Sequence, residues 1–324
     1  MPTSHRILRL LRADPDVWIS GEELSRQLGV SRSAVWKHIR TLRQEGYDIG
    51  ASPRKGYRLT QVSPWLLPAE IQEGLRTQRF GKEEVVYFRE TDSTNTRAKD
   101  LAAGGAPEGT LVIAEAQTGG RGRKGRSWFS PPGEGIYLSM VLRPRISPIE
   151  APKITLIAGI AAAETLLEAF PGLDVHIKWP NDILVGAKKV AGTLTEIASD
   201  MDQVAYVVSG MGINVNGRRF PAELKEIASS ICVETGCPAD RAVLVRSLLE
   251  RYEKEYMSFL QKGPAPMLDR WKALSRTLGK RIQVDTPQGR RTGTARDLDR
   301  DGGLLLEDDQ GRMFTIISGD VNPG

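Results

Sequence analysis

The sequence predicts an α/β protein of several domains: an N-terminal winged helix-turn-helix, a central mixed α/β domain and a small C-terminal β-barrel of the SH3-like type. Three observations lead to this prediction. A chain of 324 residues is too long for one core. Two capped helical segments lie close together near the N-terminus, and the last part of the chain contains only short strand-like runs. We place the domains at residues 1–63, 64–277 and 278–324.

The first domain contains two short helical segments joined by a tight turn. Ser20 and Glu23 have the spacing of a capping box, Gly29 ends the first helix, and Ser31 begins the second. Apolar residues recur at helical spacing in both segments, which gives each a buried face. Two helices joined in this way predict a helix-turn-helix. The strand-like runs 47–51 and 56–60, with a basic tip between them, predict a wing.

The positive charge of the protein is concentrated in this first domain. The net charge is +5, and residues 1–63 hold 11 Lys and Arg against 6 Asp and Glu, whereas the rest of the chain is balanced. A charged helix face can simply be solvated, but the caps, the turn and the wing all agree here with DNA binding. The candidate contacts to bases and phosphates are Ser31, Arg32, Ser33, Lys37, Arg40, Arg54 and Lys55.

The remainder of the chain alternates between strand-like and helical segments, which predicts a mixed α/β domain. The longer predicted strands are 84–88, 110–116, 136–142 and 204–208, and the shorter ones are 175–178, 183–185 and 190–197. The predicted helices are 69–77, 95–103, 150–170 and 242–260. After residue 278 the strand-like runs 281–284, 291–298, 303–307 and 313–317 predict the barrel.

Composition argues against a membrane or secreted protein. The longest apolar run, residues 154–163, is too short to span a bilayer. Arginines interrupt the apolar N-terminus, unlike a signal peptide. Cys232 and Cys237 have neither a second cysteine pair nor a nearby histidine, which argues against a zinc site or a disulfide framework. We therefore expect a cytoplasmic protein.

The segment from Gly120 to Gly125 matches the G-x-G-x-x-G pattern of dinucleotide-binding folds. That pattern needs a helix directly after the glycines, and Ser-Trp-Phe-Ser-Pro-Pro cannot supply one. Four cations also crowd the loop, and they would repel each other until an anion arrives. We expect a loop that closes over a phosphate-containing ligand. A flexible basic surface loop is the alternative.

Four other short motifs contain chemically useful side chains. Asp92–Asn95 lies at a strand-to-helix transition, where hydroxyl and amide groups can cap the helix and line a pocket. Lys178–Asp182 is a turn with a cation, an aromatic ring and a carboxylate, and Lys188–Gly192 begins the next strand with lysines. Gly210–Asn214 ends a strand with closely spaced glycines, which leave room for a planar ligand.

Taken together, the motifs DSTN (92–95), QTGGRGRKGR (117–126), WFSP (128–131), KWPND (178–182), KVAG (189–192) and GINV (212–215) resemble the bifunctional biotin protein ligases, also known as biotin operon repressors. They occur in the order typical of that family, and the resemblance extends over nearly the whole chain. The combination is specific, although no single motif is.

The resemblance implies an enzyme that joins biotin and ATP into biotinyl-5′-AMP and transfers biotin to a lysine of a biotin carboxyl carrier protein. It implies Mg²⁺ as a cofactor, with Asp182 reaching the ion through water. It also implies operator DNA as a partner, and a homodimer when the adenylate is bound. The biotin-binding residues implied are Ser93, Thr94, Asn95, Gln117, Arg121, Gly122, Arg123 and Lys189. Those near the adenylate are Trp128, Asn214 and Lys189, and the catalytic ones are Lys189, Arg121 and Arg123.

Three alternatives remain open at this stage. A lipoate-type ligase shares the same activation and transfer chemistry, although the DNA-binding domain and the GRGRKG loop argue against it. A repressor that senses a metabolite would bind biotin and DNA without modifying a protein. A ligase could also keep a helix-turn-helix that no longer binds DNA.

Overall fold

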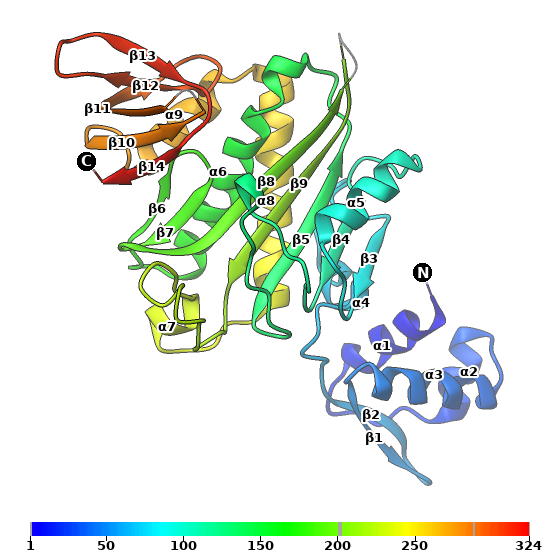
Figure 1. The fold of residues 1–324 in the computed structure, drawn as a ribbon. Helices are drawn as coiled ribbons and strands as arrows, with labels where there is room; N and C mark the ends of the chain where they lie inside the picture. The colour runs from blue at the N-terminus through cyan, green and yellow to red at the C-terminus, as the bar shows by residue number, and fades with distance from the viewer. Residues whose placement is uncertain (1, 200–202, 288, 324) are drawn as a thin grey trace. The chain divides into compact units, whose positions relative to one another are not determined.

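A computed structural model describes residues 2–199, 203–287 and 289–323 (Figure 1). The chain divides into two compact units, with the boundary between Glu73 and Gly74. Within these residues no helix combines the length and apolar character that a bilayer span requires.

The N-terminal unit is a winged helix-turn-helix, as predicted. Its elements are α1 (Thr3–Ala13), α2 (Gly21–Leu28), α3 (Arg32–Gln44), β1 (Asp48–Ser52), β2 (Gly56–Gln61) and α4 (Pro68–Gln72). The strands β1 and β2 pair antiparallel to form the wing. Helix α1 was not predicted, although Ile7, Leu8 and Leu11 give it a buried face and pack it into the unit.

The helix ends follow the sequence signals with one exception. The hydroxyls of Ser20 and Ser31 each accept a backbone N–H three residues further on, and Gly29 ends α2 in the left-handed conformation. The predicted capping box is only half formed, because the Glu23 carboxylate accepts hydrogen bonds from Arg26 instead of reaching back to the start of the helix.

Glu70 of α4 joins three segments of the N-terminal unit. It accepts a hydrogen bond of 2.5 Å from the Tyr47 hydroxyl and forms an ion pair with Arg12 of α1. Burial, together with this hydrogen bond, raises the pKa of Tyr47. These contacts hold α4 against α1 and the start of the wing, so the compact unit continues beyond residue 63 to Glu73.

The second unit is built on a seven-stranded sheet in the order β3-β4-β5-β9-β8-β7-β6. Only β3 and β4 pair parallel, and the other neighbours are antiparallel. The strands are β3 (Val85–Phe88), β4 (Leu111–Ala114), β5 (Gly135–Leu142), β6 (Val175–Lys178), β7 (Asp182–Val185), β8 (Lys188–Ser199) and β9 (Val204–Asn214).

Helices cover both faces of this sheet (Figure 1). On one face α5 (Thr94–Ala103) hydrogen-bonds to Glu196 of β8, and on the other α6 (Lys153–Ala169) hydrogen-bonds to Thr195. Consecutive residues of a strand point to opposite faces, which places the two helices on opposite sides. Helix α8 (Arg241–Lys262) packs beside α6. Helices α7 (Ile231–Thr235) and α9 (Ala265–Leu274) were not predicted, and the predicted helix 69–77 ends at Gln72.

The chain ends in an antiparallel sheet of five strands in the order β13-β12-β11-β10-β14. These are β10 (Arg281–Thr286), β11 (Gly289–Leu298), β12 (Leu304–Glu307), β13 (Met313–Ile316) and β14 (Asp320–Pro323). The sheet confirms the strand-rich C-terminal domain, and its closure into a barrel stays a prediction.

The turn between β11 and β12 docks this sheet onto the central domain. Lys153 of α6, only 3% exposed, forms a 3.0 Å ion pair with Asp301. The Trp179 indole N–H donates to the Gly302 carbonyl at 3.2 Å. Gly302 has a φ of 85°, and an added Cβ would press on Leu156, so this position requires glycine. The turn thereby supports the Lys178–Asp182 segment.

We predict that Asp301→Asn lowers the free energy of unfolding by about 1–3 kcal/mol at neutral pH, because it leaves the Lys153 ammonium buried with a weaker partner. Chemical denaturation measures this loss. The hydrogen bond from Lys153 lowers the pKa of Asp301, so the stabilisation is present above about pH 4 and is lost as pH falls through the lower pKa of the folded state.

The matched control is Asp297→Asn, which removes a more exposed ion pair to Lys272. We expect this control to lower the free energy of unfolding by less than about 1 kcal/mol. Equal losses in the two variants would contradict a special role for the Asp301 contact.

Candidate functional site

One cavity of about 500 Å³ collects the residues that the sequence singled out in the second unit. All ten predicted ligand-binding residues line it: Ser93, Thr94, Asn95, Gln117, Arg121, Gly122, Arg123, Trp128, Lys189 and Asn214. These residues come from segments spread over more than a hundred positions of the chain. The seven-stranded sheet brings these segments together.

One end of the cavity is lined by buried amide and hydroxyl groups. Gln117 accepts a 2.8 Å hydrogen bond from the Thr94 backbone N–H and donates to the Ser130 hydroxyl at 3.0 Å. Ser93 stands at the N-cap of α5, but its side chain makes no capping hydrogen bond. The prediction that the hydroxyls cap this helix is therefore wrong for Ser93, because the Gln117 side chain supplies an acceptor at the first turn.

The glycine-rich loop lies between β4 and β5, which pair antiparallel. A single 3₁₀ turn, Arg123–Gly125, occupies the loop, and the Gly122 N–H closes it on the Arg126 carbonyl at 2.7 Å. No helix follows the glycines before β5, which confirms the exclusion of a dinucleotide-binding turn.

The cations of the loop contact the C-terminal sheet. Lys124 lies 3.1 Å from the Asp320 carboxylate, and Arg126 forms an ion pair with the same group. Arg123 donates to the Ser318 hydroxyl at 3.1 Å, and burial lowers its pKa. The expected mutual repulsion of these cations is present, because the charge of Arg126 lowers the pKa of Arg123, and Asp320 offsets part of it.

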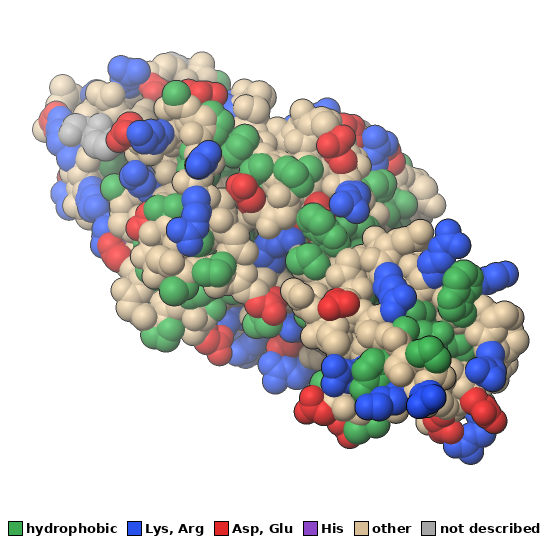
Figure 2. Space-filling model, turned by 90° about the horizontal axis from the view of Figure 1, so that it is seen from below, with side chains coloured by type: hydrophobic (Ala, Val, Ile, Leu, Met, Phe, Trp, Pro, Cys, Tyr) green, Lys and Arg blue, Asp and Glu red, His purple; other side chains and the backbone are tan. Residues whose placement is uncertain are grey.

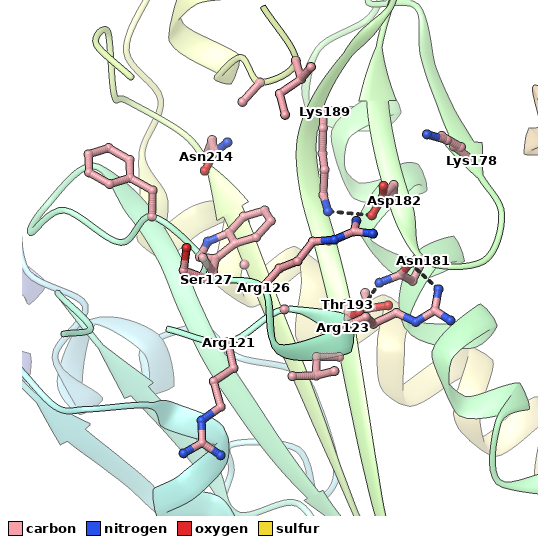
Figure 3. Close-up of a pocket in the computed structure, with 18 of the residues that line it drawn as sticks. Arg121, Arg123, Arg126, Ser127, Lys178, Asn181, Asp182, Lys189, Thr193 and Asn214 are labelled. Atoms are coloured by element: carbon pink, nitrogen blue, oxygen red, sulfur yellow. Dashed lines mark hydrogen bonds and ion pairs between the residues drawn. The ribbon is translucent and has the colours of Figure 1, made fainter. Parts of the chain in front are cut away.

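Figure 3 shows that the two predicted catalytic arginines point in different directions. Arg123 extends toward Asn181, with a 3.4 Å hydrogen bond, whereas the exposed side chain of Arg121 extends away from Lys189. Lys189, Arg123 and Arg126 lie around the middle of the cavity, and Arg121 belongs to its polar end.

Lys189 sits at the centre of the cavity. Its ammonium lies 2.6 Å from the Asp182 carboxylate and 5.1 Å from the centre of the Trp128 ring. The pairing of β7 with β8 brings the Lys178–Asp182 turn beside the lysine. An ion pair and a cation–π contact thus hold the charge in place.

The other end of the cavity is aromatic. The rings of Phe129 and Phe220 lie 6.4 Å apart, and Trp128 stands beside them. Asn214 is held there by a 3.0 Å hydrogen bond from its amide to the Ser229 carbonyl. Flat apolar surface beside an oriented amide is suited to binding a heteroaromatic ring.

The glycines of β9 make room for side chains of the protein itself. A Cβ on Gly212 would overlap the Trp128 indole, and one on Gly210 would overlap the Asn95 carboxamide. Both glycines also line the cavity, so the expectation that they leave space for a planar ligand stays a prediction. They shape the cavity indirectly, because each lets a lining side chain lie against the strand.

The predicted DNA-binding side chains of the first unit are all exposed: Ser31, Arg32, Ser33, Lys37, Arg40, Arg54 and Lys55. Figure 2 shows many Lys and Arg side chains over this unit. Trp36, 54% exposed, shares the face of α3 with Arg40. Arg43 does not belong to this free surface, because its guanidinium donates to the Ile49 carbonyl and supports the wing.

The sequence missed several lining residues. Arg126, Asn181, Phe220 and Asp320 all line the cavity. Arg126 and Asn181 lie within recognised motifs, so proximity to those motifs could have indicated them. Nothing in the local pattern around Asp320 signals its position, because it reaches the loop only through the docking of the C-terminal sheet.

Three family models match the chain in succession. An HTH domain matches residues 3–58, the Biotin/lipoate A/B protein ligase family matches residues 87–214, and the Biotin protein ligase C terminal domain matches residues 277–322.

Similar proteins cover the full length or the second unit. The chain is 41% identical over 320 residues to the Bifunctional ligase/repressor BirA of Bacillus subtilis (98% of each chain) and 37% identical to that of Escherichia coli (90% of this chain, 88% of the other). Among solved structures, the biotin protein ligase of Aquifex aeolicus in complex with biotin and ATP is similar at a TM-score of 0.64 and 30% identity, covering 74% of this chain and 98% of that one. This chain therefore belongs to the bifunctional ligase/repressor family of biotin protein ligases.

Proposed function

We propose that this protein activates biotin with ATP to biotinyl-5′-AMP, transfers the biotin to a lysine of a biotin carboxyl carrier protein, and represses transcription when the adenylate is bound. The observation that carries the proposal is the arrangement of chemical groups in one cavity: a buried amide beside Gly210, the Lys189 ammonium and the Trp128 ring beside Gly192 and Gly212, and Asn214 at the end of β9. Biotinyl-adenylate has the matching order of a polar ring system, a phosphate and a purine.

Residues at the two ends of the cavity would orient the substrates. The buried Thr94 and the half-buried Gln117 offer hydrogen-bonding groups to the biotin ring, with Ser93, Asn95 and Arg121 at the same end. Trp128 and Asn214 offer a flat face and an amide to the adenine. Holding both substrates in one cavity lowers the entropic barrier to their reaction.

In the first step an oxygen of the biotin carboxylate attacks the α-phosphorus of ATP. A carboxylate–phosphate bond forms, and the bond to the departing pyrophosphate breaks. Both reactants are anions, so Lys189 and Arg123 would offset their repulsion and the charge that develops on the phosphate. The present partners of these two cations, Asp182 beside Lys189 and the Ser318 hydroxyl beside Arg123, would be exchanged for phosphate oxygens.

The second step requires no nucleophile from this chain. The amine of the acceptor lysine attacks the biotinyl carbonyl carbon, an amide bond forms, AMP leaves, and the amine proton passes to solvent. Mg²⁺ would supply charge neutralisation on the triphosphate. Within the described residues no cluster of three carboxylate, histidine or cysteine side chains could hold the ion by itself, which fits a metal that arrives bound to ATP.

The repressor activity would depend on the exposed basic face of the first unit. The exposed side chains at the start and on one face of α3 would enter the major groove, and Arg54 and Lys55 at the wing tip would contact phosphates; the former are Ser31, Arg32, Ser33, Lys37 and Arg40. We propose that adenylate binding favours a homodimer, which presents two such units to two operator half-sites. A cytoplasmic location is consistent with this role.

We predict that Lys189→Ala slows formation of the adenylate by about 10²–10³-fold, because it removes a preorganised cation from the reacting phosphate. The measurement is the intact mass of a biotin carboxyl carrier domain after incubation with the protein, biotin, ATP and Mg²⁺. Wild type should add one biotinyl group.

Lys188→Ala is the matched control, since the adjacent lysine donates to the Lys225 carbonyl and forms no ion pair with any acidic residue that the structure describes. It should transfer biotin at nearly the wild-type rate. If wild type bound biotin without modifying the carrier domain, the protein would be a sensor and not a ligase.

We predict that Lys37→Ala weakens operator binding and reduces the slope of log affinity against log salt by about one, because one phosphate contact is lost. Titration of labelled operator with the adenylate-bound protein at several salt concentrations measures both quantities. Arg26→Ala is the control, because Arg26 already pairs with Glu23 at 2.6 Å on α2. Unchanged affinity in Lys37→Ala would remove α3 from the DNA interface.

A further inference from the structure

Resting on the proposed function, we propose that Glu196 is a positioning residue for the biotin site, acting through Asn95 and Ser139 to fix the Thr94 hydroxyl as a hydrogen-bond acceptor. The site would thereby select a ligand that presents an N–H at this point, as the biotin ureido group does.

Asn95 is the first link between Glu196 and the cavity. Its side-chain N–H group donates to the Glu196 carboxylate at 2.8 Å and to the Leu194 carbonyl at 3.2 Å. When Glu196 is ionised, neither its carboxylate nor the Leu194 carbonyl has a proton to donate, so both act only as acceptors. The Asn95 amide therefore has one allowed orientation. Gly210 keeps the carboxamide against β9, where an added Cβ would overlap it. The Asn95 carbonyl oxygen consequently points to Ser139.

Glu196 is held ionised by its surroundings. Burial raises the pKa of its carboxyl, but hydrogen bonds from Lys99 and Asn95 outweigh burial and lower the pKa overall. The Lys99 ammonium lies 2.7 Å from the carboxylate, and the positive charge of Arg121 acts in the same direction. Glu196 therefore remains an acceptor at physiological pH.

Ser139 transmits this orientation to the cavity. The Ser139 side chain is fully buried, and its hydroxyl lies 2.6 Å from the Asn95 carbonyl oxygen and 2.8 Å from the Thr94 hydroxyl. A hydroxyl has one proton, and the carbonyl oxygen can only accept, so the Ser139 proton goes to Asn95. Ser139 can then only accept from Thr94.

The second neighbour of the Thr94 hydroxyl, Gln117, likewise gives it no proton. The Gln117 carbonyl oxygen, 3.1 Å from the Thr94 hydroxyl, is also an acceptor. Whether Thr94 donates to Ser139 or to Gln117, its only proton stays inside the protein. What Thr94 presents to the cavity is an oxygen lone pair, and a ligand that places an oxygen there would leave two facing oxygens with no proton between them.

The test compares biotin with its cyclic carbamate analogues, in which an oxygen replaces one or the other ureido N–H. Dissociation constants are measured for both ligands on the full chain. We expect wild type to prefer biotin over the analogue that places oxygen at Thr94 by about 100-fold or more. Glu196→Met, which removes the acceptor but retains an unbranched chain, should reduce that preference about tenfold.

Glu196→Gln is the conservative variant, because its carbonyl can still accept from Asn95. It should retain a preference within about threefold of wild type, and the KM for ATP should change less than twofold in both variants. If Glu196→Met weakened both ligands equally, or left the preference unchanged, the positioning role would be overturned. Wild type that bound neither ligand would contradict the proposed function itself.

Discussion

The absence of side chains at Gly210 and Gly212 of β9 is the constraint on which the cavity depends. Asn95 lies against the first position and the Trp128 indole against the second, so both ends of the site are set by one strand. β9 can have this role because β5 and β8 pair with it on either side and hold its backbone at the centre of the sheet. A methyl group at either position would displace a side chain that lines the cavity. The shape of the site therefore depends partly on two positions of the sheet that carry no side chain.

Around the reaction centre, part of the positive charge is balanced before any substrate arrives. Lys189 is paired with Asp182, and the loop cations Lys124 and Arg126 are paired with Asp320. A cluster of unpaired cations in a half-buried cavity would destabilise the fold. Carboxylate partners avoid that cost, and they leave groups that a phosphate can replace with little change in local charge. The C-terminal sheet thus takes part in the electrostatics of the site as well as in its support.

Local patterns predicted most of the helices, the wing and most strands, and the family resemblance carried by the short motifs implied ten lining residues. Those residues lie in short motifs whose glycines, caps and charges are visible within a few positions. What the sequence could not predict depends on long-range docking or on register. Asp320 meets Arg126 only because the turn at Asp301 seats the C-terminal sheet on α6. Glu196 looks like an ordinary strand residue until the register of β8 places it beneath Asn95. Helix α1 was missed although its apolar spacing is regular.

The network around Glu70 has an evolutionary consequence. Its contacts to Arg12 and Tyr47 all lie between residues 2 and 73. A genetic exchange with its crossover just after Glu73 would leave these contacts of Glu70 intact. It would transfer the complete core of the first unit as one segment. Such a module can be gained, lost or replaced as a whole, while the catalytic framework keeps its own packing. Regulation and catalysis can therefore diverge at different rates within a single gene.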